Sequence, residues 1–107
     1  MSNTIAAIIL TKDEEKHIAR CINSLKGVCE EVFVIDCFSS DRTKTVAESL
    51  GAKVYQHPWK NYATQFNWGL HNCPITADWV WRIDADEFLD KGLGQSVKKT
   101  ITECEDD

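Results

Sequence analysis

The sequence predicts a three-layer α/β fold, in which a mostly parallel sheet of about four strands carries helices on both faces. Two observations lead to this prediction. Short apolar runs alternate along the chain with segments whose apolar residues recur at helical spacing. Strands that alternate with helices form βαβ units, and their right-handed crossovers give parallel strand pairing. With 107 residues the chain has the size of one small domain, which we expect to span residues 1–107.

The first half of the chain contains two predicted strand–helix pairs. The run TIAAIIL at residues 4–10 is rich in isoleucine, which is typical of a strand buried on both faces. We expect Thr11 and Glu14 to begin the next helix as a capping box. The run EVFVID at residues 31–36 predicts a second buried strand, and residues 39–51 predict a second helix.

The second half continues the alternation. Residues 52–58 predict a shorter strand, because Pro58 cannot continue a hydrogen-bonded ladder. Residues 61–72 predict a helix with three apolar residues on one face, Tyr62, Phe66 and Leu70.

The last predicted strand is ADWVWRID at residues 77–84, which we interpret as buried. Alternate residues of a strand share a side, so one side carries Trp79, Trp81 and Ile83, and the other carries Val80, Arg82 and Asp84. A spacing of four residues then predicts a final helix through Leu93, Val97 and Ile101.

The composition excludes several classes of protein. A net charge of −5 and the lack of a basic run argue against nucleic-acid binding. Five scattered cysteines without a C-x-x-C pair indicate reduced thiols in a cytosolic protein. The apolar run near the N-terminus is too short to span a bilayer and lacks the basic flank of a signal peptide. We therefore expect the mature chain to begin at its own first strand.

Polar residues follow three of the predicted strands. In open parallel sheets, ligands bind beyond the carboxyl ends of the strands. This rule brings together residues 11–13, 36–39 and 84–86 along one edge of the sheet. The sequence therefore predicts a polar site at that edge.

Asp84 and Asp86 form a D-x-D motif in this site. On an extended chain, such residues project the same way about 6.5 Å apart. Two ionised carboxylates at that distance repel by about 2.5 kcal/mol at an effective dielectric constant near 20. A divalent cation offsets this repulsion, and magnesium or manganese typically uses one or two carboxylates together with substrate phosphates. The alternative is a solvated strand end, in which Asp84 caps a turn and Glu87 faces water.

Other phosphate and metal motifs do not fit the sequence. No G-x-G-x-x-G or G-x-x-x-x-G-K loop occurs, which excludes dinucleotide-binding and P-loop sites. The D-x-D follows the fourth predicted strand, whereas phosphatases with an aspartyl nucleophile usually carry it on the first. An EF-hand is excluded, because the glycine and the later ligands are missing.

Taken together, these segments resemble the nucleotide-sugar-binding half of the family 2 glycosyltransferases, which are inverting enzymes with a Rossmann-like GT-A fold. The chain is most similar to the bacterial transferases that build lipopolysaccharide core and other envelope glycans. The similarity follows the family's order in four segments, IILTKDEEKHIARCINSL, EVFVIDCFSSDRTKTVAESLGAKVYQHPW, NYATQFNWGL and DWVWRIDADE. The resemblance implies a domain that binds a nucleoside-diphosphate sugar, with a UDP-sugar as the expected donor.

The resemblance also implies roles for residues on the nucleotide side. Thr11, and Asp13 where relatives often have asparagine, would line the base pocket. Asp36 would contact the base or the ribose, although it could instead cap the turn that follows its strand. Gln65 and Asn67 fall where relatives often show a basic residue followed by asparagine near the nucleotide.

The D-x-D of the family binds the ribose and the metal on the diphosphate. The resemblance therefore implies that Asp84 contacts the nucleotide sugar and that Asp84 and Asp86 hold Mn²⁺ or Mg²⁺. Arg82 is unusual beside these acids. We expect it to pair with Asp84, and contact with phosphate is the alternative.

The turn after the second strand departs from the family pattern. Relatives commonly read D-D-G-S or D-S-G-S, whereas this chain has Phe38 in place of the glycine. Glycine adopts positive φ cheaply. Its replacement by Phe38 therefore leaves open whether this chain keeps the family's turn and its base contact at Cys37.

The chain is also shorter than the family, whose members have about twice this many residues. Their second half supplies the acceptor site and the catalytic base, so we assign no catalytic residue here and interpret the chain as a portion of a longer enzyme. The resemblance implies a cytoplasmic protein, peripheral at the inner membrane, with a glycan or lipid-linked acceptor held by the missing half. The alternative is a non-catalytic nucleotide- or metal-binding module that self-associates as a homo-oligomer.

Overall fold

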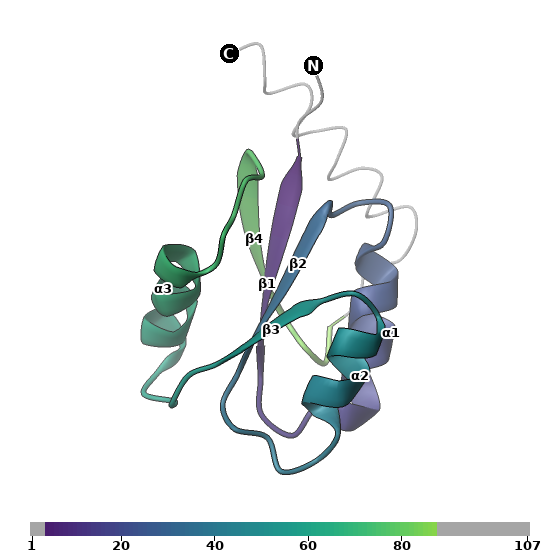
Figure 1. Ribbon diagram of the computed structural model, residues 1–107, viewed down its shortest axis with the longest axis vertical. Helices are drawn as coiled ribbons and strands as arrows, with labels where there is room; N and C mark the ends of the chain where they lie inside the picture. Colours follow the sequence, from purple (N-terminus) through teal and green to yellow (C-terminus); the bar gives the residue numbers. More distant parts are fainter. Residues whose placement is uncertain (1–3, 88–107) are drawn as a thin grey trace.

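The protein folds around one parallel sheet with the strand order β3-β2-β1-β4 (Figure 1). This computed structural model describes residues 4–87. All three strand pairings are parallel. The strands are β1 (Ile5–Thr11), β2 (Glu31–Asp36), β3 (Lys53–Gln56) and β4 (Trp79–Asp84). The structure thus confirms the predicted α/β fold and its four parallel strands.

The central strand β1 is buried along its whole length, as its isoleucine-rich sequence predicts. Successive side chains enter two different cores, because alternate residues of a strand face opposite sides of the sheet. Ile5, Ala7 and Ile9 belong to one core, and Ala6, Ile8 and Leu10 belong to the other.

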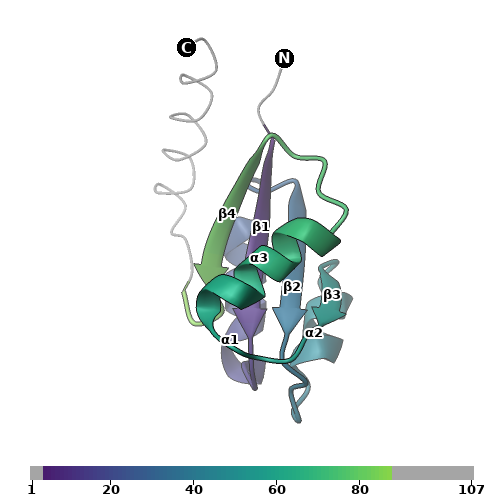
Figure 2. The ribbon, with the colours of Figure 1, turned by 90° about the vertical axis from the view of Figure 1, so that its left-hand side faces the viewer.

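Helices cover both faces of this sheet (Figure 2). The helices α1 (Glu15–Leu25) and α2 (Thr43–Ser49) pack on one face, and α3 (Tyr62–Asn72) packs on the other. The spacing of Ile18, Cys21, Ile22 and Leu25 explains this packing, since all four lie on the buried side of α1. In the part of the chain that the structure describes, no helix combines the length and the apolar character that crossing a bilayer requires.

The predicted capping box at the start of α1 is wrong. Thr11 is the last residue of β1, and its hydroxyl donates to Asp36 instead of capping a helix. The helix begins at Glu15, and groups from the neighbouring segment satisfy its first amides: the backbone N–H of Glu15 donates to the carboxylate of Asp41, and that of Glu14 donates to the hydroxyl of Thr43. Thr43 is also the first residue of α2, which therefore starts later than the predicted residue 39.

The predicted apolar face of α3 is only partly its buried face. Phe66 packs against the core, but Tyr62 and Leu70 are exposed, and the fully buried residues of the helix are Gln65 and Gly69. An added Cβ on Gly69 would lie 3.1 Å from the Ile35 side chain, so the glycine lets the helix approach β2 closely. Close backbone packing at Gly69, together with the contacts of Phe66 and Trp68 with the core, therefore sets the orientation of α3.

The prediction that β4 is a buried strand is also wrong. This strand lies at the edge of the sheet, and Trp79, Val80 and Arg82 are exposed. Of its side chains, Ile83 and Trp81 pack into the core beside α1. The predicted final helix through Leu93, Val97 and Ile101 lies outside the described residues.

Phe38 has a positive φ of 48°, so it keeps the conformation that glycine would adopt cheaply. Its ring is 59% exposed, so it buries little apolar surface. We expect Phe38→Gly to raise the free energy of unfolding by about 1 kcal/mol, because glycine has no Cβ penalty in this conformation. Urea denaturation measures the change.

Asp13 provides the matched control, since it also has a positive φ, of 52°. Its carboxylate accepts hydrogen bonds from the backbone and the hydroxyl of Ser40. Asp13→Gly loses these bonds, so it should give no gain. Destabilisation by Phe38→Gly would mean that contacts of the ring outweigh the backbone strain.

Candidate functional site

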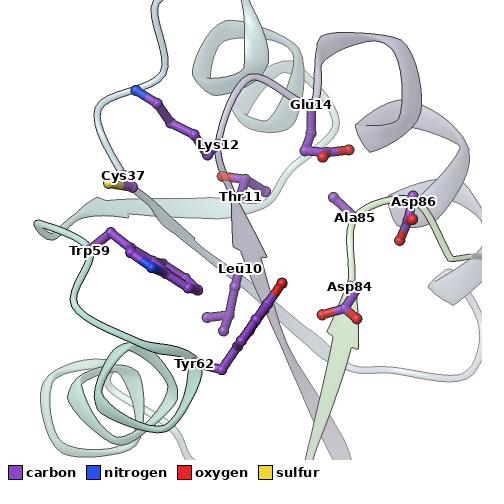
Figure 3. Close-up of a pocket in the computed structure, with 10 residues that line it drawn as sticks. All are labelled: Leu10, Thr11, Lys12, Glu14, Cys37, Trp59, Tyr62, Asp84, Ala85 and Asp86. Carbon is purple, nitrogen blue, oxygen red and sulfur yellow. The ribbon is translucent and has the colours of Figure 1, made fainter.

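A pocket of about 470 Å³ opens beyond the carboxyl ends of the strands (Figure 3). It lies at the switch point of the sheet: β1 has β2 on one side and β4, the last described strand in the chain, on the other. One wall comes from the end of β4, namely Asp84, Ala85 and Asp86. The floor includes Leu10 and Thr11 at the end of β1. The prediction from the sequence placed a site at this edge.

Asp84 presents a buried carboxylate oxygen to this pocket. Among the described residues, its Oδ1 atom has no hydrogen-bond partner. Figure 3 shows the carboxylate turned toward the pocket interior. A buried polar atom without a partner is uncommon in folded proteins, since leaving it unpaired costs about 1–3 kcal/mol. The atom therefore fits a cation or a donor group of a ligand.

The chain turns directly after Asp84, so the D-x-D is not extended as the sequence analysis assumed. The backbone N–H of Glu87 donates to the carbonyl oxygen of Asp84, at 2.9 Å. In return, the Glu87 carboxylate accepts from the backbone N–H of Asp84. The turn keeps Asp86 exposed and buries Ala85. Glu87 thus holds the turn, and the acids on either side of Ala85 both remain at the pocket.

The two acids suit a divalent cation that completes its ligand shell from a substrate. Within residues 4–87, no cluster of three or more His, Cys, Asp or Glu side chains could enclose a metal ion. Magnesium and manganese are commonly held by one or two carboxylates together with phosphate oxygens and water. Asp84 and Asp86 would hold the ion in this way, with the unpartnered Oδ1 atom of Asp84 as the fitting feature.

Asp36 is fully buried under the pocket floor and does not line the pocket. Its carboxylate accepts from the hydroxyl of Thr11, at 2.6 Å, and from the backbone and the hydroxyl of Ser39. These contacts tie the end of β1 to the turn after β2. They agree with the turn-capping alternative for Asp36, and its contact with a nucleotide stays a prediction.

Thr11 lines the pocket, although its hydroxyl proton is directed to Asp36. Asp13 lies outside the lining, because its carboxylate holds the Ser40 backbone and hydroxyl at the start of the neighbouring loop. The structure brings Thr11, Asp84 and Asp86 together at one pocket, and the role of Asp13 there stays a prediction.

The two candidate residues on α3 lie away from the pocket. Gln65 is buried and clamps His57, through its Oε1 atom to Nδ1 at 2.8 Å and its Nε2 group to the backbone oxygen at 3.0 Å. Asn67 is exposed on the helix surface. Neither residue lines the pocket.

The expected ion pair between Arg82 and Asp84 is wrong. Within residues 4–87, no ion pair joins Arg82 to Asp84. The Arg82 guanidinium instead lies 5.9 Å from the centre of the Tyr62 ring. The strand register explains this contact. Arg82 lies beside Ile8 of β1, which belongs to the core on the α3 side of the sheet, so the Arg82 side chain projects toward α3.

Trp59 and Tyr62 line the pocket, and the sequence analysis missed them. Trp59 lies between β3 and α3, and Tyr62 is the first residue of α3, where the side chain of Asn61 caps the helix by accepting from the backbone N–H of Thr64. The signal was available: Trp59 follows a strand whose carboxyl end points to the same edge as the other site residues.

Cys37 is the half-exposed thiol of the pocket. Burial raises the pKa of the Cys73 thiol to about 11, and burial with the added effect of the Glu87 carboxylate raises that of Cys21 to about 12. Thiolates are the reactive form, so iodoacetamide near neutral pH should modify Cys37 before these two. UDP with Mn²⁺ should slow that modification, as mass spectrometry of the labelled peptides would show.

Cys29 is the internal control, because it is also half-exposed but lies outside the pocket. Its rate of modification should not respond to the nucleotide. Equal protection of Cys29 and Cys37 would point to general tightening of the fold instead of occupancy of the pocket.

A parallel α/β sheet with an acidic pocket at its switch point is typical of nucleotide-binding proteins. The chain belongs to glycosyl transferase family 2, whose model matches residues 6–106. It is 43% identical over 98 residues to an uncharacterized glycosyltransferase of Rickettsia bellii, with 92% of this chain and 33% of the relative covered. It is 31% identical to the lipopolysaccharide core biosynthesis glycosyltransferase LpsC of Rhizobium meliloti, with 91% and 37% covered.

Solved structures show the same fold. Residues 1–349 of TarS from S. aureus match with a TM-score of 0.77 and 26% identity, over 94% of this chain and 32% of that one. Glucosyl-3-phosphoglycerate synthase from Mycobacterium tuberculosis, in complex with Mn²⁺, UDP and phosphoglyceric acid, matches with a TM-score of 0.65 and 25% identity. That match covers 80% of this chain and 34% of the synthase.

The chain spans about a third of the length of the curated relatives that it matches. The sequence analysis expected about a half, so the relatives contain more additional chain than we expected.

Proposed function

We propose that this domain binds a nucleoside-diphosphate sugar, with UDP as the nucleotide, in the pocket at the end of β1 and β4. The observation that carries the proposal is the unpartnered, buried Oδ1 atom of Asp84 at the pocket wall. In this proposal, Asp84 and Asp86 hold Mn²⁺ or Mg²⁺, and Asp84 also contacts the nucleotide sugar. The complex of the mycobacterial synthase with Mn²⁺ and UDP supports the choice of ligands.

The residues of this chain would bind and orient the donor. When bound, the metal supplies positive charge beside the diphosphate, whose negative charge grows as the bond to the sugar breaks. Asp36 keeps the ends of β1 and β2 in register through Thr11 and Ser39, so the pocket floor is formed before the donor arrives. Such pre-organisation reduces the entropy that binding costs.

The acceptor and the general base belong to the part of the relatives that this chain does not span. Inverting transfer needs a base aligned with the acceptor hydroxyl, and that help alone is typically worth about 10²–10⁴ in rate. We therefore propose that residues 1–107 bind the donor without transferring the sugar on their own. A role in envelope glycan synthesis is supported by the similarity to LpsC, a glycosyltransferase of lipopolysaccharide core biosynthesis. A place at the cytoplasmic side of the inner membrane stays a prediction. Self-association of the domain stays a prediction.

Calorimetry with UDP in the presence of Mn²⁺ and in the presence of EDTA tests the proposal. We expect measurable affinity with the metal and at least about tenfold weaker binding without it, because the diphosphate would then face two uncompensated carboxylates. GDP and CDP serve as controls for the base. Equal affinity with and without metal would contradict the proposed site, and preferred binding of GDP or CDP would contradict the choice of UDP.

A further inference from the structure

Trp59 and Tyr62 form an aromatic wall on the side of the pocket away from the end of β4 (Figure 3). Their side chains are 44% and 58% exposed, which is a large area of aromatic surface to leave in water. The two rings meet edge to face, with their centres 4.8 Å apart. An exposed aromatic surface beside polar groups in a pocket is typical of a ligand-binding wall.

The orientation of this wall is fixed by contacts that lead back to the acidic turn. The ring plane of Trp59 stands at 89° to that of Tyr62, so one ring buttresses the other. The Tyr62 ring in turn lies 5.9 Å from the Arg82 guanidinium, a distance at which cation–π attraction operates. Arg82 and Asp84 lie on the same side of β4, two residues apart. One strand thus carries both the acid of the pocket and the cation that holds its aromatic wall.

We propose that Trp59 is the surface on which the base of the nucleoside diphosphate stacks, and that Tyr62 and Arg82 position it. This inference rests on the proposed function. The acidic turn takes the diphosphate with its metal, so the base would extend away from that turn, toward the aromatic wall. A flat base matches the flat indole, and stacking on an aromatic side chain is worth about 1–3 kcal/mol per base, which corresponds to about fivefold or more in affinity.

The test compares UDP, a UDP-sugar and inorganic pyrophosphate, each titrated with Mn²⁺ into the protein and its variants. Trp59→Ala should weaken UDP binding about tenfold while leaving pyrophosphate binding unchanged, because pyrophosphate lacks a base. Trp59→Phe should recover most of the affinity. Trp79→Ala is the matched control, since Trp79 on β4 has a similar exposure of 42% but lies outside the pocket. It should bind all three ligands as the unaltered protein does.

A positioning role for Arg82 predicts a specific coupling. Arg82→Gln should weaken UDP binding about two- to threefold, and it should have no further effect in a protein that already carries Trp59→Ala. Weaker pyrophosphate binding by Arg82→Gln would show direct contact with phosphate and overturn the positioning role.

Three outcomes would overturn the stacking assignment while leaving the proposed function intact. They are unchanged UDP binding by Trp59→Ala, an equal loss for UDP and pyrophosphate, and a loss confined to the UDP-sugar, which would assign the indole to the sugar ring. Absence of UDP binding by the unaltered protein would overturn the proposed function together with the stacking assignment.

Discussion

Asp84→Ala should weaken the metal-dependent binding of UDP by about a hundredfold and leave the fold intact. Loss of groups that only support a metal ligand commonly costs about 10–100-fold in metal affinity, so loss of the ligand itself should reach at least the upper end. The Oδ1 atom of Asp84 is buried without a partner among the described residues. Its removal should therefore keep the free energy of unfolding within about 1 kcal/mol, or raise it slightly. Calorimetry with Mn²⁺ and urea denaturation measure the two effects.

Two further substitutions make this result specific. Asp86→Ala should reduce metal-dependent binding as well, because Asp86 lines the same pocket. Asp78→Ala removes an exposed carboxylate just before β4, outside the pocket, and should leave UDP binding unchanged. A large loss of stability in Asp84→Ala, with UDP affinity preserved, would identify Asp84 as a structural cap of its turn and contradict the proposed metal site.

Asp36→Ala should lower the free energy of unfolding by about 3 kcal/mol or more. The substitution leaves the hydroxyl of Thr11 and the backbone N–H of Ser39 without the acceptor that they have in the folded protein. Hydrogen bonds to charged groups contribute about 1.5–3 kcal/mol each, and a buried donor left without a partner adds a desolvation cost. Because Asp36 is fully buried, water cannot easily replace the carboxylate.

Thr11→Val measures the contribution of one hydrogen bond to the Asp36 carboxylate. It keeps the volume and removes one donor, so it should cost about 1–2 kcal/mol, clearly less than Asp36→Ala. Urea denaturation of both variants gives the comparison. Equal small losses in the two variants would show that the Asp36 carboxylate contributes little to the fold and would leave nucleotide contact as its main role.

The parts of the fold that the sequence predicts well are those that a single segment determines. The apolar runs of β1 and β2 predict buried strands, since a strand in the middle of a parallel sheet is apolar on both sides. At Phe38 the sequence marked the turn after β2 as a departure from the family pattern without determining its conformation, which the structure shows to have a positive φ.

The parts that it predicts poorly depend on neighbours distant in the chain. The exposure of β4 follows from its place at the sheet edge, which its own sequence does not encode. The orientation of α3 depends on contact between Gly69 and Ile35, and the amides at the start of α1 depend on Thr43. In each case a tertiary contact outweighs the local pattern.

The same distinction holds for the candidate site. Strand ends and the D-x-D spacing predict Thr11, Asp84 and Asp86 at one pocket, where the structure places them. Trp59 and Tyr62 were missed, because an aromatic residue in a small domain is interpreted as core unless its exposure is known. Gln65 was a candidate from the resemblance to the family, but its side chain hydrogen-bonds to His57.

The pairing of β1 with β4 has a consequence for the order in which the protein assembles. Thr4 and Asp78, which hydrogen-bond each other beside this pairing, are 74 residues apart in the chain, so the strands meet only when a long loop closes. Closing such a loop costs entropy before its contacts repay it, and folds rich in distant pairings form slowly. The earlier units, β1 to β3 with their helices, join segments much closer in sequence. Of the described elements, the acidic turn should therefore reach the pocket last during synthesis, after the pocket floor at the end of β1 has assembled.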